Sequence, residues 1–323
     1  MKFSIPYNCD TQLLTELLQQ NLIESVEDIY FAANPEILPS GRRPKIKNYI
    51  KFNGDEVHFD SENYDQDIDQ LFHFCHKHRI KINLLLNFSS ILTVEQLKYV
   101  QQMIDMGVKI VTVGNMELLK QIKDSITSDI QIQNSVYFKL NHRKEIFNAI
   151  SNGIAIFLFP PNKNHKLQYI NALAGILRSH KIQLKLMVNE GCLIQCNHRY
   201  NCQKDSQKYS IESAINDYLN NVEKHRVLDH PCREYLNQYG IEQTNFIHPH
   251  EIKNYKHIDF TYKIVGRSFS TENILCSMKA YKSGSYKGDL RRIIENFKHS
   301  VKPLYTSYSK TYFLTKENDK SDC

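Results

Sequence analysis

Three of the eight cysteines in this chain fall within eleven residues, at Cys192, Cys196 and Cys202, and a fourth, Cys232, follows after a gap of 29 residues. A mostly apolar stretch, 182–188, runs directly into the first of them, as expected of a buried strand that delivers side chains at its carboxyl end. Thiolates that converge at a strand end can bind zinc or an iron–sulfur cluster. No other group of residues in the sequence points so directly to a chemistry.

The gaps between these cysteines narrow the choice of metal. Three residues separate Cys192 from Cys196, and five separate Cys196 from Cys202. This is neither the pair of CxxC knuckles of a zinc ribbon nor the tight three-cysteine loop of radical S-adenosylmethionine enzymes. Iron–sulfur clusters accept ligands from separate loops, so this spacing suits them. A zinc site remains possible if His198 or His230 replaces one cysteine as a ligand. The remaining interpretation is that these thiols bind no metal. We favour metal binding, because the cysteines lie in an otherwise polar loop directly after a core strand.

The rest of the chain is read from its hydrophobic pattern. Short runs rich in Ile, Leu, Val and Phe alternate with amphipathic helical stretches, which is typical of strands buried on both faces of a parallel sheet. The predicted strands are 2–6, 28–33, 81–87, 109–113, 135–139, 154–159, 183–189 and 262–265, and the predicted helices include 11–21, 94–106, 119–126, 143–151 and 167–180. Eight such units predict a TIM-type (β/α)8 barrel with some irregularity, and a doubly wound open sheet is the main alternative.

Two stretches depart from this repeat. The segment 34–70 is polar and irregular, with a small β excursion predicted at 49–59, and the segment 197–250 is rich in His, Cys and Pro. In a barrel, the second would be a cysteine-bearing insertion between strands seven and eight, above the carboxyl ends of the strands. The sequence therefore predicts one barrel domain over 1–308 and a polar tail over 309–323.

Composition sets limits on the class of protein. The chain has 323 residues, of which 41% are hydrophobic, and no apolar run approaches the ~20 residues that a membrane helix needs. The first residues lack the apolar core of a secretory signal, so we expect a cytoplasmic protein without membrane insertion. In that compartment clustered cysteines bind metal or do catalysis more often than they form disulfides. The net charge of +6 is spread along the chain and permits nucleic-acid contact without requiring it.

Several segments together resemble the peptidase U32 family, the collagenase-like proteins. They read NEGCLIQC at 189–196, PCR at 231–233, FIHPHEI at 246–252 and YKIVGR at 262–267. The likeness is sharpest between about residues 185 and 286. The cysteine spacing differs from that of the best-known members, and Pro39 stands where one branch of the family has a ligand.

This resemblance implies a [4Fe–4S] cluster at the barrel mouth, held by Cys192, Cys196, Cys202 and Cys232, with Cys276 in reserve for the fourth position. Relatives take part in oxygen-independent hydroxylation of transfer RNA, ribosomal RNA or a quinone precursor. The resemblance therefore implies that this protein takes part in redox modification of an RNA base or of a small aromatic substrate. Zinc is the alternative metal.

Lys263 and Arg267 are the predicted catalytic residues. They flank Gly266 at the end of the last predicted strand, where the active site of a barrel lies, and an arginine there can bind a carboxylate or phosphate with two parallel hydrogen bonds. A salt bridge that closes the barrel is an equally good interpretation.

Two other functions remain open. The family name suggests a peptidase, but the sequence has neither the HExxH motif of zinc peptidases nor a GxSxG nucleophile elbow. A cysteine peptidase would need Cys192 or Cys232 beside His198 or His230. The third interpretation is a non-catalytic, metal-stabilised subunit that pairs with a related barrel chain.

Overall fold

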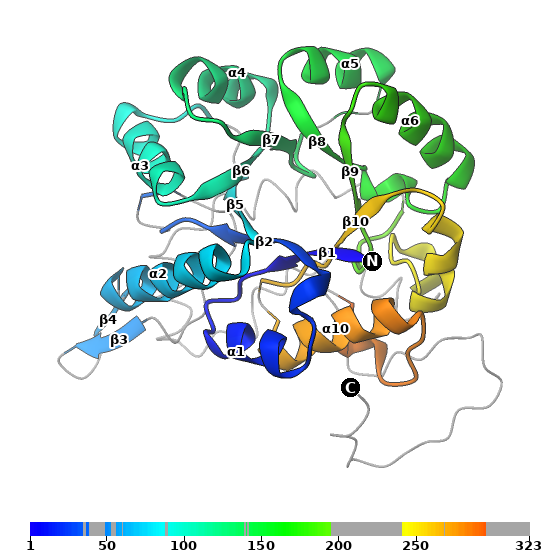
Figure 1. Cartoon of the computed structure of the whole chain (residues 1–323), viewed down its shortest axis with the longest axis horizontal. Helices are drawn as coiled ribbons and strands as arrows, with labels where there is room; N and C mark the ends of the chain where they lie inside the picture. The colour runs from blue at the N-terminus through cyan, green and yellow to red at the C-terminus, as the bar shows by residue number, and fades with distance from the viewer. Residues whose placement is uncertain are drawn as a thin grey trace.

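Eight parallel strands close into a barrel, with the order β1-β10-β9-β8-β7-β6-β5-β2 around it (Figure 1). The computed structural model describes residues 1–34, 37–38, 49–52, 56–59, 61–87, 90–138, 140, 142–194, 241–267 and 269–294. The barrel strands are β1 (Lys2–Pro6), β2 (Val26–Ala32), β5 (Lys81–Leu86), β6 (Val108–Val113), β7 (Gln131–Asn134), β8 (Ile154–Leu158), β9 (Gln183–Met187) and β10 (Phe260–Lys263). The predicted TIM-type (β/α)8 barrel is confirmed, and the open sheet is wrong.

Helices surround the barrel, as Figure 1 shows. They are α1 (Gln12–Gln19), α2 (Ser61–His78), α3 (Val94–Asp105), α4 (Met116–Ser125), α5 (Arg143–Ser151), α6 (Leu167–Ser179) and α10 (Thr271–Ser283), with short 3-10 turns η1 (Ile23–Ser25), η3 (Pro161–Lys163), η5 (Ile241–Gln243), η6 (Pro249–Tyr255) and η7 (Leu290–Arg292). Local sequence fixes several of their starts. Thr93 caps α3 in a capping box with Gln96. The side chains of Asn115 and Ser270 cap α4 and α10 by accepting the N–H of the third residue of each helix.

Two elements differ most clearly from the sequence prediction, and other ends, such as those of Phe260–Lys263 against the predicted 262–265, differ by two or three residues. The fifth barrel strand is Gln131–Asn134 and not 135–139, because Gln133 turns its amide into the barrel interior while Ser135 begins a turn. The apolar residues after Asn134 suggested a strand. The segment that pairs with β6 and β8 is instead the shorter one before them, in which Gln and Ile alternate. Helix α2 begins at Ser61, inside the stretch 34–70 predicted to be irregular.

The β excursion predicted at 49–59 is confirmed. Strands β3 (Tyr49–Phe52) and β4 (Glu56–Phe59) form an antiparallel hairpin, which Figure 1 shows projecting beside α2. The main core lies between the barrel and its helices, where the apolar faces of α1, α3, α4 and α6 pack on outward-facing strand residues. None of the helices in the described part of the chain is long and apolar enough to cross a membrane.

The insertion that carries the cysteines leaves β9 and returns at β10, the seventh and eighth barrel strands, as predicted. Its described parts are the residues up to 194 and from 241 onward. Residues 195–240 lie outside the described residues, and so does the predicted tail 309–323.

Candidate functional site at the barrel mouth

Cys192 lies in the mouth of the barrel, five residues beyond the end of β9. Its side chain is half-buried. The carboxyl ends of all eight strands meet at this end of a parallel barrel, so this is where the sequence analysis placed the site. Cys196, Cys202, Cys232, His198 and His230 lie outside the described residues.

The backbone around Cys192 is held by a second segment of the same insertion. The N–H of Asn245 donates to the carbonyl of Cys192 at 2.8 Å, and Leu193 and Thr244 form an antiparallel bridge. The N–H of Ile247 donates to Val188 at 2.9 Å on the same side. The chain after β9 is therefore an extended arm with a fixed partner, so Cys192 has a defined position.

Asn189 ties this arm to the neighbouring strand. Its side-chain Nδ2 donates to the carbonyl of Val265 at 2.8 Å, and its Oδ1 accepts from the N–H of Val265 at 2.7 Å. The side chain thus pairs with the backbone of Val265 as a neighbouring strand would. It also donates to the carbonyl of Ile293 at 3.0 Å. One buried side chain thus joins the cysteine arm, the end of β10 and the segment after η7.

Lys263, the last residue of β10, is buried, and its Nζ lies 4.1 Å from the ring centroid of Tyr30 on β2. A cation over a tyrosine face at this distance is attracted to the ring, more strongly when water is excluded. The Tyr30 hydroxyl donates to the carbonyl of Ile264 at 2.7 Å, which fixes the ring. Lys263 therefore supplies positive charge just below the mouth.

Arg267 lies half-buried beyond Gly266, near Tyr64 of α2, and its charge opposes the rise that burial causes in the pKa of Tyr64. Gly266 has φ +134°, and an added Cβ would lie 2.6 Å from the ring of Phe269. The turn that places Arg267 therefore depends on glycine. The two predicted catalytic residues come from one strand end, but Lys263 is buried beside Tyr30 of β2, whereas Arg267 is half-buried and acts on Tyr64 of α2.

Beneath the mouth, the barrel interior holds a polar layer that the sequence analysis missed. Ser4, Asn83, Gln133 and Lys185 belong to the first, third, fifth and seventh strands, and all four are buried. Alternate strands of a TIM barrel usually fill such a layer with branched apolar side chains. The only signal in the sequence was one polar residue at an inward position of each of these strands.

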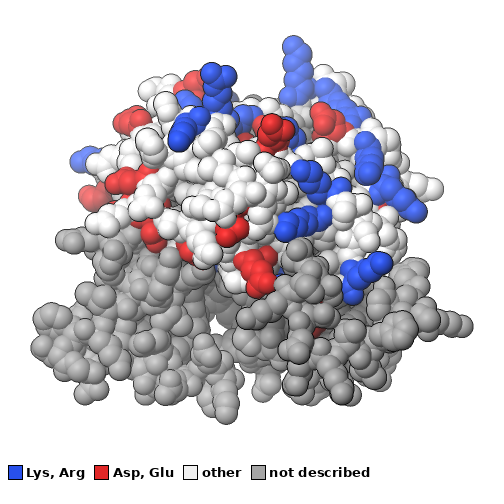
Figure 2. All heavy atoms as spheres, turned by 60° about the horizontal axis from the view of Figure 1, so that its bottom comes forward, with Lys and Arg blue, Asp and Glu red and all other residues white. Residues whose placement is uncertain are grey.

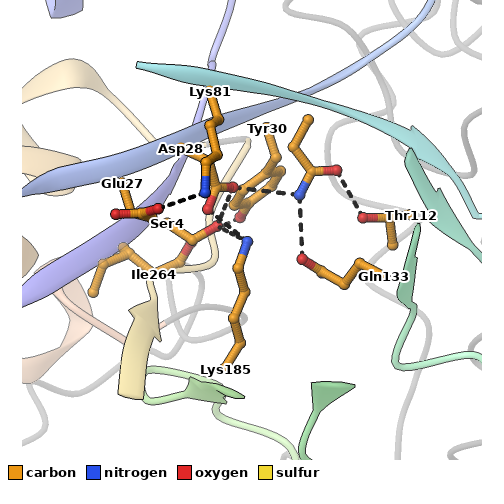
Figure 3. Close-up of polar contacts among 10 residues, drawn as sticks. Ser4, Glu27, Asp28, Tyr30, Lys81, Thr112, Gln133, Lys185 and Ile264 are labelled. Carbon is orange, nitrogen blue, oxygen red and sulfur yellow. Dashed lines mark hydrogen bonds and ion pairs between the residues drawn. The ribbon is translucent and has the colours of Figure 1, made fainter. Parts of the chain in front are cut away.

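An ion pair holds this layer together. Lys185 Nζ lies 2.5 Å from Asp28 Oδ2 and 3.3 Å from Ser4 Oγ, and Figure 3 shows the two charged side chains pointing toward one another. Ser4 and Asn83 donate to Asp28 Oδ1 at 2.7 and 3.3 Å. Burial lowers the pKa of Lys185, and the adjacent Asp28 opposes that shift. The pair is buried on both sides, so each side chain depends on the other for its hydrogen-bonding partner.

The layer continues toward the fifth strand. Thr112 donates to Asn83 Oδ1 at 2.8 Å, and Asn83 Nδ2 lies 3.3 Å from Gln133 Oε1 (Figure 3). The Nε2 of Gln133 is buried and has no hydrogen-bond partner among the residues that the structure describes. Above this layer, Leu158, Met187 and Val265 form a small apolar cluster at the ends of three strands.

The described residues contain no group of three His, Cys, Asp or Glu side chains that could hold a metal ion, so a site around Cys192 would need ligands from outside them. Cys276, the reserve ligand, is buried in α10 and is disulfide-bonded. Glu190 accepts a hydrogen bond from the Asn245 amide at 3.1 Å and supports the arm.

His248, next to this arm, should make folding stability depend on pH. Burial and the nearby His250 ring, 4.1 Å away, lower the pKa of His248 to about 4. The unfolded chain takes up a proton below about pH 6.5, whereas the folded chain does so only near pH 4. We expect unfolding by urea at pH 5 to show about 1 kcal/mol less stability than at pH 7 from this group, after allowance for solvent screening.

The matched test compares two histidine variants. His248→Asn should flatten the pH dependence between pH 7 and 5, whereas His257→Asn, at an exposed histidine bonded to Asn171, should leave it unchanged. Equal pH dependence in wild type and His248→Asn would contradict the expectation.

Comparison with known proteins gives a fold neighbour. No protein-family model and no curated protein matches the sequence. The structure of the U32 peptidase Mk0906 matches with a TM-score of 0.50 at 10% identity, over 82% of this chain and 93% of its own. An endo-1,4-beta-mannanase from Rhizomucor miehei matches at 0.40 and 9% identity, over 81% of this chain and 84% of its own. A mandelate racemase/muconate lactonizing protein from Paracoccus denitrificans reaches 0.35 at 10% identity, over 64% and 50%.

The likeness to Mk0906 shows a shared fold. This chain has a U32-like barrel over most of its length, and the two weaker matches add nothing to that statement.

Proposed function

We propose that the mouth of this barrel binds a [4Fe–4S] cluster through Cys192, Cys196, Cys202 and Cys232, and that the protein takes part in oxygen-independent redox modification of an aromatic ring or nucleobase. The observation that carries the proposal is the half-buried side chain of Cys192 on an arm fixed to the ends of two barrel strands. A cluster ligand needs such a fixed thiolate at a strand end. A bound cluster would supply electrons or act as a Lewis acid.

The surrounding residues fit such a group in two respects. Leu158, Met187 and Val265 form a buried apolar cluster at the ends of β8, β9 and β10, and apolar surroundings limit the access of water to a bound group. Lys263 provides a buried positive charge on the adjacent strand, which favours an anionic substrate group or a negatively charged cluster. In this proposal, Arg267 binds an anionic part of the substrate at the outer edge of the mouth.

The proposal predicts bound iron in the protein as purified without oxygen. We expect about four irons and four sulfides per chain and a broad absorption band from thiolate-ligated iron. Cys192→Ala should lower the iron content several-fold, because the arm offers no other thiol at that position. Cys9→Ala, at another half-buried cysteine, is the matched control and should keep the wild-type iron content.

Other outcomes point to the other functions. One zinc per chain in a colourless protein would overturn the redox proposal and favour a structural metal site. Peptide cleavage by metal-free protein, blocked by a thiol reagent, would favour the peptidase that the name of the fold neighbour suggests. Co-purification with a related barrel chain, without activity of this chain alone, would favour the subunit.

A further inference from the structure

The strand register places the four side chains of the polar layer at one level of the barrel. Pairing across β2 sets Ser4 of β1 against Lys81 of β5, two residues before Asn83. The same offset of two residues recurs between β5 and β7, between β7 and β9, and between β9 and β1. This is the stagger of a TIM barrel, in which side chains from alternate strands fill one layer. Four side chains therefore point at one level toward the barrel axis: Ser4, Asn83, Gln133 and Lys185.

Hydrogen bonds join these side chains along three sides of the layer. Lys185 Nζ donates to Ser4 Oγ at 3.3 Å. Asn83 Nδ2 donates to Gln133 Oε1, also at 3.3 Å. Between these two pairs, Asp28 Oδ1 accepts from both Ser4 and Asn83. Among the described residues, no hydrogen bond closes the fourth side, between Gln133 and Lys185.

The orientation of the Gln133 amide follows from the same bonds. Asn83 turns its Nδ2 toward the carboxylate of Asp28, 3.3 Å away, and its Oδ1 toward the Thr112 hydroxyl. The same Nδ2 faces Gln133, which must present its oxygen there. The Nε2 of Gln133 is buried and has no partner in the part of the chain that the structure describes. The open side of the layer therefore carries a buried donor.

Lys185 supplies a second donor. Its ammonium has three hydrogens, of which described side chains accept two, at Asp28 Oδ2 and Ser4 Oγ. Figure 3 shows the end groups of Lys185 and Gln133 directed toward the same central region of the barrel. An ammonium and an amide N–H cannot bond to one another, because both donate. Only an acceptor between them can complete the layer.

The wall beside these two donors is apolar. Strand β8 runs between β7 and β9, and its residues Ile156 and Leu158 are buried. Ile156 pairs in register with Gln133, and Leu158 pairs with Lys185, so both side chains point to the same interior face. Apolar walls lower the local dielectric constant and strengthen the attraction of both donors for negative charge.

The charges inside the barrel also favour a negative ligand. Figure 2 shows charged side chains of both signs on one face of the molecule, where water and salt screen them. In the eight barrel strands, all of which the structure describes, the buried charged side chains are Asp28, Lys185 and Lys263. Two are basic and one is acidic, so a single anion would balance them.

We propose that one small monatomic anion, such as chloride, binds inside the barrel between Gln133 Nε2 and Lys185 Nζ. Water suits these donors less well, because its two hydrogens need acceptors, and each oxygen of the four side chains and of Asp28 already accepts a hydrogen bond. The ion is then a part of the scaffold beneath the candidate site. The inference goes beyond the proposed function and requires no cluster.

The test compares the thermal unfolding midpoint of the full-length protein in sodium chloride, sodium bromide and sodium gluconate at equal ionic strength. A ligand that binds only the folded protein raises this midpoint as its concentration rises. We expect each tenfold rise in chloride or bromide above its dissociation constant to raise the midpoint by about 2–4 °C relative to gluconate. Equal midpoints in all three salts would overturn the inference and leave water as the occupant.

Gln133→Glu tests the site itself. This variant keeps the shape of the side chain and replaces the donor by a carboxylate oxygen, which can accept from Lys185 directly. Its midpoint should therefore no longer rise with halide. Gln131→Glu makes the same change at a partly exposed residue of β7 and should keep the wild-type response. A response lost in both variants, or kept in both, would contradict the assignment.

Crystals grown in bromide locate the ion directly. We expect an anomalous peak between Gln133 and Lys185 in the wild type and none there in Gln133→Glu. A peak without any halide response of the unfolding midpoint would mean binding at crystal concentration only and would overturn the proposal. Wild-type crystals without the peak would overturn it too, and they decide the matter even if Gln133→Glu does not fold.

Discussion

Replacing Lys185 with methionine should destabilise the barrel by about 3–5 kcal/mol, because it leaves Asp28 as a buried carboxylate without its cation. Lys185 is 2% exposed and lies 2.5 Å from Asp28 at the centre of the polar layer. Ser4 and Asn83 would still donate to the carboxylate, but they carry no compensating charge. Urea unfolding followed by circular dichroism measures the loss.

A neighbouring ion pair on the same strand is the control. Glu27 pairs with Lys81 at 2.9 Å on the outer face of β2, where the two side chains are 29% and 34% exposed. Lys81→Met should cost less than about 1 kcal/mol, because exposed ion pairs contribute little.

The double variant separates charge from packing. Adding Asp28→Asn to Lys185→Met removes the buried charge and should recover most of the lost stability. If the single and double variants were equally unstable, the loss would come from packing and the proposed role of the ion pair would be wrong.

Gly266→Ala should also destabilise the protein by about 3 kcal/mol or more. Its φ of +134° disfavours any side chain, and the new Cβ would lie 2.6 Å from the Phe269 ring, so backbone strain and overpacking add. The variant should also displace Arg267, the next residue. Thermal unfolding gives the stability, and protection of the 264–270 backbone from hydrogen exchange reports on the turn.

Gly284 provides the comparison. It caps α10 with φ +70°, and an added Cβ would meet nothing closer than 3.7 Å. Gly284→Ala should therefore cost only about 1 kcal/mol, the price of the left-handed conformation. A similar loss at both glycines would show that contact with Phe269 contributes little.

The polar layer and the mouth have different roles. The ion pair of Lys185 and Asp28 is sealed beneath apolar side chains and stabilises the scaffold, whereas Cys192, Lys263 and Arg267 lie at or near the strand ends. Asn189 connects the two strands that carry these residues. The same buried amide therefore fixes the distance between the proposed cluster ligand and the proposed anion-binding residues.

The sequence by itself determined the class of fold. Hydrophobic runs of strand length alternate with amphipathic helices. The spacing of apolar residues within each segment decides whether it forms a strand or a helix, whatever element packs against it. The start of α3 at its capping box and the extent of α5 followed from local residues in the same way. The position of Cys192 after the seventh strand also followed, because strand order in a barrel follows chain order.

Only the tertiary structure decided which polar residues meet. Ser4, Asp28, Asn83, Gln133 and Lys185 are far apart in the chain, and the alternation of a strand does not say whether a polar side chain faces solvent or a partner across the barrel. The fifth strand was misplaced for this reason. A glutamine such as Gln133 is typical of the surface, and only the closed barrel shows that its side chain faces Asn83. Closure of the barrel sets those contacts, and closure depends on all eight strands at once.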